Sequence, residues 1–483
     1  MTAAAERAGA ATSYDETPYL THIYPQSHPD RLATHAALFG IPYAPVETCR
    51  VLEIACGDAA NLVSLALTHP EARFVGFDLA PTAIERGRSF IDTLGLTNIT
   101  LHHADIRDAH GELGEFDYVI AHGVYAWIPR DARDALLALI RRTLAPAGVG
   151  FVSYNALPGC RVRQVLRDML RFALRDIEGA AARAKAIRQV LGEIAEALPS
   201  ERPFSVAIRE EARSMLRRPL ALVAHDELGE VYHPVHLFEF LDHCAHHGLR
   251  FLTEAESRNC ADGFIPTHAL DDAGYDVAAR AQEADFAMLR CFHQTLVVRE
   301  DLAFSRRPRA ELLFDLHVAT PAKLNKAGEF EVGRQSVEIE DEALSAAVGR
   351  LGAAWPASVP VSELLGEDEE RALALLNMYW LGAVELHVVP LRFMNAPGPR
   401  PAASPLARLL AKSGATRLLT LRQSTVEFQD EFSLEFIAGL DGSRTVEELV
   451  RDVCVRLDAP VDKVGPAVEA NLGSMARIGL LVQ

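Results

Sequence analysis

Short apolar runs alternate with amphipathic stretches through the first third of the chain. Apolar runs rich in Val, Ile and Phe predict strands at residues 50–56, 73–78, 98–104, 116–121 and 149–154. The stretches between several of them predict helices at 60–67, 81–94 and 130–144. Strands that alternate with helices are typical of a parallel sheet with right-handed crossovers. The pattern therefore predicts a doubly wound, Rossmann-like α/β sheet.

The next part of the chain first leaves this pattern and then returns to it. Residues 159–228 are rich in Arg and Ala and carry no strand signal, which predicts a helical insertion. A helix at 234–247, a strand at 249–253, a helix at 278–289 and a strand at 292–299 follow. We interpret these last elements as the return of the chain to the sheet.

The C-terminal third contains a weak internal repeat. The sequence VEIEDE at 337–342 resembles VEFQDE at 426–431, and each copy continues into helices and a terminal strand. The repeat predicts two α+β winged-helix-like modules joined by a proline-rich linker at 396–405. Their candidate recognition helices, 368–380 and 461–477, are not basic, so a protein-contact or scaffold role is favoured over DNA binding.

The chain is therefore expected to divide into five parts. They are a sheet core with an N-terminal cap, the helical insertion, a middle region that returns to the sheet, and two winged-helix-like modules. Their predicted bounds are 1–158, 159–228, 229–300, 301–395 and 405–483.

Composition narrows the environment and the partners. The chain has 483 residues and a formal net charge of −18, which argues against general nucleic-acid binding. It has no apolar run long enough to cross a bilayer and no signal-peptide core at its start, so no membrane contact and a cytoplasmic location are expected. The seven cysteines form no C-x-x-C pair, which disfavours disulfides. His243 and His247 have spacing that suits a metal ion on a helix, but no H-E-x-x-H motif occurs and no metal is expected.

The strongest chemical signal follows the first predicted strand. Small residues at Ala55, Gly57 and Ala59 let a ligand approach the backbone of the turn. Asp78 ends the second strand, where a carboxylate suits the two hydroxyls of a ribose. At the end of the third strand Asp105 suits an adenine amine. All these positions meet at the carboxyl edge of the sheet, where such folds bind ligands.

Two ligands compete for this edge, a dinucleotide and S-adenosylmethionine. A dinucleotide requires G-x-G-x-x-G so that its pyrophosphate reaches helix N–H groups. Here alanines occupy the positions of two glycines, and Asp58 lies in the turn with Glu53 before it. Acidic residues oppose a pyrophosphate and suit the ammonium and sulfonium groups of S-adenosylmethionine, which is therefore the predicted cofactor.

Four segments resemble class I methyltransferases that carry a methyltransferase regulatory domain and a C-terminal winged-helix domain. They are 25–34 (PQSHPDRLAT), 53–61 (EIACGDAAN), 122–129 (HGVYAWIP) and 153–159 (SYNALPG). The resemblance covers most of the chain, and its characterised members methylate lysines of rickettsial outer-membrane protein B. It implies a methyltransferase in which these residues bind the cofactor: Tyr14, Tyr19, His28, Arg31, Glu53, Ala55, Gly57, Asn61, Asp78, Leu79, Ala104, Asp105, Ile106 and His122.

The acceptor side is expected after the fourth and fifth strands. Tyr125, Trp127 and Tyr154 would surround the transferred methyl group by cation–π contact, or would simply pack the core. His122 would contact the methionine part of the cofactor or accept a proton. These four are the candidate catalytic residues. The predicted reaction is N-methylation of protein lysine side chains, with methylation of a small biosynthetic intermediate as the alternative. A third hypothesis is a binding protein that has kept the fold without catalysis. The sequence is also compatible with a homodimer.

Overall fold

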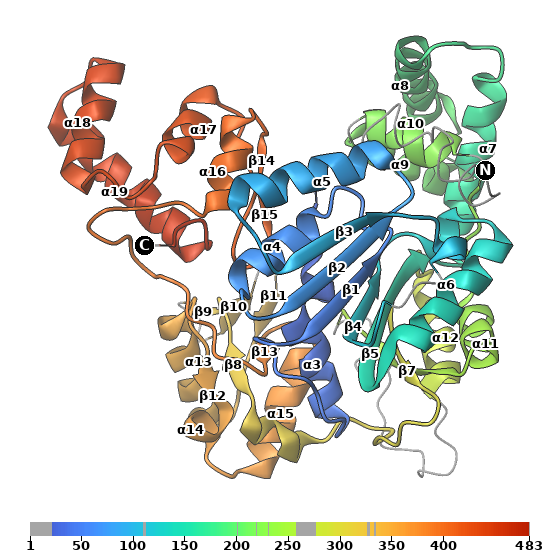
Figure 1. The fold of residues 1–483 in the computed structure, drawn as a ribbon, viewed down its shortest axis with the longest axis horizontal. Helices are drawn as coiled ribbons and strands as arrows, with labels where there is room; N and C mark the ends of the chain where they lie inside the picture. Colours follow the sequence, from blue (N-terminus) through green and yellow to red (C-terminus); the bar gives the residue numbers. More distant parts are fainter. Residues whose placement is uncertain are drawn as a thin grey trace.

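A seven-stranded sheet forms the centre of the molecule in the computed structural model (Figure 1). The structure describes residues 22–482 apart from 110–112, 200, 219, 230, 257–276, 326–328 and 333–334. Its strand order is β3-β2-β1-β4-β5-β7-β6. The strands are β1 Arg50–Ile54, β2 Arg73–Asp78, β3 Ile99–His103, β4 Phe116–Ala121, β5 Leu144–Asn155, β6 Leu249–Glu254 and β7 Phe292–Arg299.

The first five strands are parallel, and the chain then returns to the sheet as predicted. β1 pairs in parallel with β2 and β4, and β4 with β5. β7 is antiparallel to both β5 and β6. The predicted doubly wound α/β class is therefore confirmed. β5 begins at Leu144, directly after the preceding helix ends at Thr143 and earlier than its apolar run at 149–154 predicted.

Alternate strand residues face two separate apolar layers. Val51 packs in the layer covered by α3 (Pro29–Leu38), α4 (Ala60–Thr68) and α5 (Pro81–Leu94). Leu52 packs in the opposite layer, which α6 (Arg130–Thr143) and α11 (Leu237–His246) cover. Side chains of successive strand residues point to opposite faces. Burial on both faces explains the apolar runs of the central strands β1, β2 and β4.

The predicted helical insertion has its own core at one corner of the sheet (Figure 1, green). Buried Leu166, Leu170 and Leu191 are among the side chains that hold its helices together. After it, α11 and α12 (Val277–Met288) accompany the return to β6 and β7. The insertion helices are α7 Cys160–Ala173, α8 Ala180–Ala197, α9 Pro203–Leu216 and α10 Leu220–Leu228.

The C-terminal third adds two small α+β units beside the face that carries α3 and α4 (Figure 1). The first contains η7 Ala310–Asp315, β8 His317–Ala319, β9 Lys323–Leu324, β10 Phe330–Val332, β11 Gln335–Val337, α13 Glu342–Ala354, β12 Val359–Pro360, α14 Val361–Leu365, α15 Glu369–Trp380 and β13 Glu385–His387. The second contains α16 Pro405–Lys412, β14 Arg417–Leu419, β15 Thr425–Glu427, α17 Glu431–Ala438, α18 Val446–Leu457 and α19 Val461–Arg477.

Two details of these units differ from the predicted pattern. Strand β8 was not predicted, since it has three residues and pairs with β12 and β13 from much later in the chain. The expected terminal strand after α19 is reduced to a single bridge between Leu481 and Ala403. Within the described residues, no helix combines the length and the apolar character that crossing a bilayer requires.

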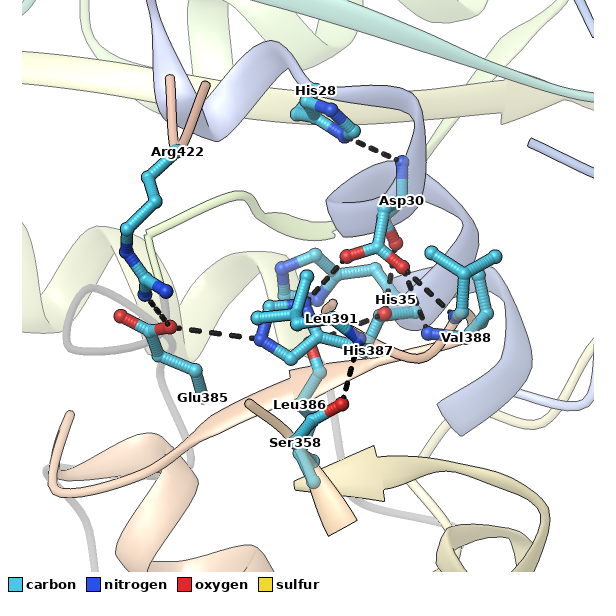
Figure 2. A network of polar contacts seen from close by, with 12 residues as sticks. His28, Asp30, His35, Ser358, Glu385, Leu386, His387, Val388, Leu391 and Arg422 are labelled. Carbon is cyan, nitrogen blue, oxygen red and sulfur yellow. Dashed lines mark hydrogen bonds and ion pairs between the residues drawn. The ribbon is translucent and has the colours of Figure 1, made fainter. Parts of the chain in front are cut away.

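A buried polar junction fastens α3 to the C-terminal units (Figure 2). One carboxylate oxygen of Asp30 lies 2.6 Å from Nδ1 of His387, and the other accepts the backbone N–H of Val388 at 2.9 Å. On the far side of this imidazole, Glu385 accepts a hydrogen bond from Arg422 at 3.1 Å. The junction therefore joins the N-terminal segment, β13 and the second unit.

The junction fixes the charge of His387. Burial lowers its pKa, but the facing carboxylates of Asp30 and Glu385 outweigh burial and raise the pKa to about 9. The imidazoles of His28 and His317 also face this group, and both are held towards the neutral form by burial. His387 is therefore a buried cation held between two carboxylates.

We predict that Asp30→Asn destabilises the protein and weakens the pH dependence that His387 gives to its stability. Removing one partner of a buried ion pair costs about 3–5 kcal/mol. The folded-state pKa of His387 lies above its unfolded value of 6.5, so its contribution is complete below pH 6.5 and is lost as the pH rises through about 9. Urea unfolding across this range should show a wild-type advantage that shrinks with rising pH. Asp301→Asn, an exposed carboxylate paired with Arg299, is the matched control and should unfold like the wild type.

Candidate active site

The turn between β1 and α4 has an unusual backbone. Ala55, Gly57 and Ala59 all have positive φ, at 57°, 56° and 56°. Glycine adopts this left-handed region freely, whereas alanine pays roughly 1–2 kcal/mol in steric strain. A Cβ added at Gly57 would meet no atom within 4 Å, so open space lies directly above the turn. The turn is thus shaped to leave its backbone accessible.

Asp78 holds this turn from the end of β2. Its carboxylate accepts the N–H of Gly57 and the N–H of Ala80, each at 2.8 Å. Burial raises the pKa of Asp78, while these backbone donors and the Leu79 amide act in the opposite direction. Asp78 is half buried at this edge of the sheet.

A second carboxylate, Glu53, lies buried beneath the turn. One of its oxygens accepts from Nδ2 of Asn61 at 3.2 Å, whereas Oε2 is buried and makes no hydrogen bond within the described structure. Burial raises the pKa of Glu53 to about 8. Asn61 in turn reaches Ser27 Oγ at 3.3 Å and accepts the N–H of Tyr24 at 3.2 Å. A buried carboxylate oxygen without a donor is suited to a cationic ligand.

An aromatic stack stands where β4 ends. The ring of His122 lies 3.4 Å from that of Tyr24, nearly parallel to it, and 6.0 Å from Phe151. Burial lowers the pKa of His122 to about 3, so the imidazole is neutral at physiological pH. Tyr24 and Ser27 are the two site residues that sequence reasoning missed. Tyr24 directly precedes the N-terminal motif at 25–34 and Ser27 lies within it, but no local pattern shows that this segment folds over the turn.

The predicted cofactor positions form a partly exposed line along the carboxyl edge of the sheet. Ala55, Leu79, Ala104, Ile106 and His122 are all half buried there. Backbone contacts connect neighbouring strand ends, since Ala104 N–H donates to Asp78 O at 3.0 Å. The fold therefore brings together the ends of β1, β2, β3 and β4.

Asp105, at the end of β3, is largely committed to Arg107. The guanidinium of Arg107 lies 2.6 Å from Asp105 Oδ2, and its backbone N–H donates to Oδ1 at 2.8 Å. The side chain of Asp105 is 4% exposed. An adenine amine would share this carboxylate with the guanidinium.

Some predicted cofactor residues lie elsewhere. His28 caps α3 and accepts the N–H of Asp30 (Figure 2). Its ring faces that of His69, which directly follows α4. Arg31 lies among the acidic groups of the C-terminal junction, including Glu385. The structure thus does not bring this pair to the turn. Tyr14 and Tyr19 fall outside the described residues.

The aromatic candidates for the acceptor side lie at different depths. Tyr154 is 0% exposed and packs against Phe240, with ring centroids 4.3 Å apart. Tyr125 is 2% exposed, and its hydroxyl lies 2.8 Å from His243 Nδ1. Trp127 is nearer the surface. Tyr154 therefore occupies a core position, as in the alternative interpretation of the sequence that these aromatic residues pack the core.

The site fits S-adenosylmethionine on its own residues. The free Glu53 oxygen suits the ammonium group, the open turn at Gly57 accommodates close approach, and Asp78 offers a carboxylate to the ribose. Residues 51–148 match the methyltransferase domain family. The class is thus an S-adenosylmethionine-dependent methyltransferase.

Matches to two further domain families and to a rickettsial protein show to which methyltransferase family the chain belongs. Residues 220–299 match the predicted methyltransferase regulatory domain, and 399–461 match the PKMT C-terminal winged helix domain. RP028 of Rickettsia prowazekii, an uncharacterized protein, is 32% identical over 231 residues, which is 48% of this chain and 92% of RP028. The chain belongs to this family of methyltransferases with a regulatory and a winged-helix domain.

Two further relatives set the extent of the likeness. RP789 of the same organism, also uncharacterized, is 31% identical over 328 residues, covering 65% of this chain but only 59% of RP789. The structure of PKMT2 from Rickettsia typhi in complex with AdoHcy superposes with a TM-score of 0.85 at 22% identity, covering 96% of this chain and all of that one. That likeness is one of fold.

We predict that cofactor binding releases protons from Glu53. Its pKa of about 8 keeps most molecules protonated at pH 7, and a cation beside the carboxylate favours the ionised form. Calorimetry of S-adenosylhomocysteine at pH 7, in two buffers of different ionisation enthalpy, should show release approaching one proton. In Glu53→Gln the release should fall towards zero. A wild-type enzyme that binds without proton release would show that the ligand ammonium lies elsewhere.

Proposed function

We propose that this enzyme methylates the side-chain nitrogen of protein lysines. The modular plan supports this proposal, because the C-terminal match is to a winged-helix domain named for PKMT proteins. PKMT2 of Rickettsia typhi also shares the fold over nearly the whole chain. The chain matches only 59% of the length of RP789, so the acceptor is proposed on the geometry of the site as well as on these domain matches.

The observation that carries the proposal is the uncharged aromatic wall at the end of β4. His122 is neutral and stacks on Tyr24. The backbone N–H of Tyr24 donates to Asn61, in the first turn of α4, so this hydrogen bond joins the stack to the helix that follows the cofactor turn. A free lysine has a pKa of about 10.4 and is protonated at neutral pH. A desolvated wall without a positive charge lowers that pKa and exposes the nitrogen lone pair. When bound, S-adenosylmethionine supplies a methyl group activated by its sulfonium.

In this proposal His122 orients the reactants and does not take up a proton. With a pKa of about 3 it is a poor proton acceptor at neutral pH, so the acceptor proton leaves to solvent before transfer. The stacked rings exclude water and orient the reactants, which is the main demand of an in-line displacement.

Trp127 is the best-placed aromatic candidate for the acceptor side. Its ring lies 4.7 Å from that of Tyr232, and the guanidinium groups of Arg163 and Arg167 lie over it at 5.8 and 5.5 Å. Both guanidinium groups also lie over the ring of Tyr232. We expect this aromatic pair to border the entry of a basic acceptor side chain.

A labelled-methyl assay tests the reaction itself. The enzyme, tritiated S-adenosylmethionine and a bacterial lysate are incubated, and the products are separated into protein and small-molecule fractions. Label in protein that is recovered as Nε-methyllysine after hydrolysis supports the proposal. Label confined to small molecules would overturn it in favour of the biosynthetic alternative.

We predict that Trp127→Ala lowers turnover far more than cofactor affinity, because positioning is realised mainly in the transition state. Trp127→Phe keeps an aromatic face and should retain most activity. Turnover per folded molecule, cofactor affinity and thermal stability should be measured together. Normal turnover per folded Trp127→Ala enzyme, with lower stability alone, would make this residue part of the core.

A further inference from the structure

The contact between α6 and α11 gathers three side chains that are typical metal ligands. Asp134 comes from α6, His243 from α11, and His247 directly follows the last residue of α11. One ligand atom from each lies within 4.8 Å of the other two. The sequence showed only the two histidines, because the carboxylate is contributed by a helix more than 100 residues earlier.

Asp134 and His243 form a close pair, and His247 places a third possible ligand atom beside them. Nε2 of His243 lies 2.7 Å from Asp134 Oδ1. The ring of His247 meets that of His243 edge to face, with centroids 5.2 Å apart, which is not a hydrogen-bonding arrangement. An ion pair with Asp134 would require only His243. His247, one helical turn away, adds a second imidazole nitrogen, so that the cluster offers two nitrogen ligands and one oxygen ligand, which zinc accepts.

Tyr125 holds His243 from behind. Its hydroxyl lies 2.8 Å from Nδ1, on the side of the ring away from Asp134. When Nδ1–H donates to this oxygen, the lone pair of Nε2 faces the cluster, which is the usual support of a metal-bound imidazole. Two atoms that bind the same zinc ion, each about 2.0–2.1 Å from it, lie farther apart than the 2.7 Å between His243 Nε2 and Asp134 Oδ1. Asp134 is 53% exposed, so its side chain can move away from His243 by this small difference.

We propose that Asp134, His243 and His247 form a zinc site whose remaining position is taken by water. The ion joins the methyltransferase match, which contains α6, to the regulatory match, which contains α11. Through Tyr125 it also steadies the segment after β4 that carries His122 and Trp127. The role is structural, and the site is independent of the proposed lysine acceptor.

Cobalt titration of the full, tag-free, chelator-treated protein tests the proposal. One equivalent should produce the visible absorption of a four-coordinate cobalt site, and zinc should displace it. His247→Ala and Asp134→Asn should each weaken binding tenfold or more. His246→Ala is the matched control, since this exposed neighbour bonds the Asp242 carbonyl and lies outside the cluster.

Two further measurements separate ligands from general surface binding. Tyr125→Phe should weaken metal affinity by about tenfold, as loss of a supporting partner does. Zinc should raise the thermal midpoint of the wild type and of His246→Ala, and leave that of His247→Ala unchanged. Absence of a cobalt spectrum at several-fold excess, or equal binding by all variants, would overturn the proposal.

Discussion

The position of helix α4 is the constraint on which the rest of the structure depends. Its first turn carries Asn61, whose amide bonds Glu53 of β1 and Ser27 of the N-terminal segment and accepts the N–H of Tyr24. One turn later, Ser64 receives a hydrogen bond from Gln423 of the C-terminal unit at 2.8 Å. The N-terminal segment and the C-terminal unit, together with the adjacent strand β1, thus fix the helix that follows the cofactor turn. The hydrogen bonds of Asn61 with Ser27 and of Ser64 with Gln423 are buried. Movement of the N-terminal segment or of the C-terminal unit would therefore leave buried polar groups without hydrogen bonds.

Burial also sets the chemistry of the site. It keeps Glu53 largely protonated and His122 neutral, so the free site carries less charge than its sequence suggests. Asp78 is stabilised in the same setting by two backbone donors. The site therefore combines an acidic group that a cationic ligand can ionise with an aromatic wall that stays uncharged, a combination suited to binding a sulfonium and desolvating an amine.

Local patterns were sufficient for the sheet and for the cofactor turn. β4 and β7 have the bounds that their apolar runs predicted, and the small residues around Gly57 mark a turn with an accessible backbone. The stack of Tyr24 on His122 and the junction of Asp30 with His387 could not be predicted in this way. Each joins residues about 100 or more positions apart, and neither partner lies in a periodic pattern that indicates the other.

The α/β class, the positions of the first five strands along the chain, and the acidic turn that favours S-adenosylmethionine over a dinucleotide could all be predicted from the sequence alone. These follow from side-chain periodicity and from residue types that act within a few positions of each other. Only the tertiary structure shows that His28 caps α3, that Arg31 lies near Glu385, that Tyr154 packs in the core, and that Asp134 meets two histidines. These depend on which faces of distant helices meet, and that choice is made by burial of the whole apolar surface rather than by any short segment.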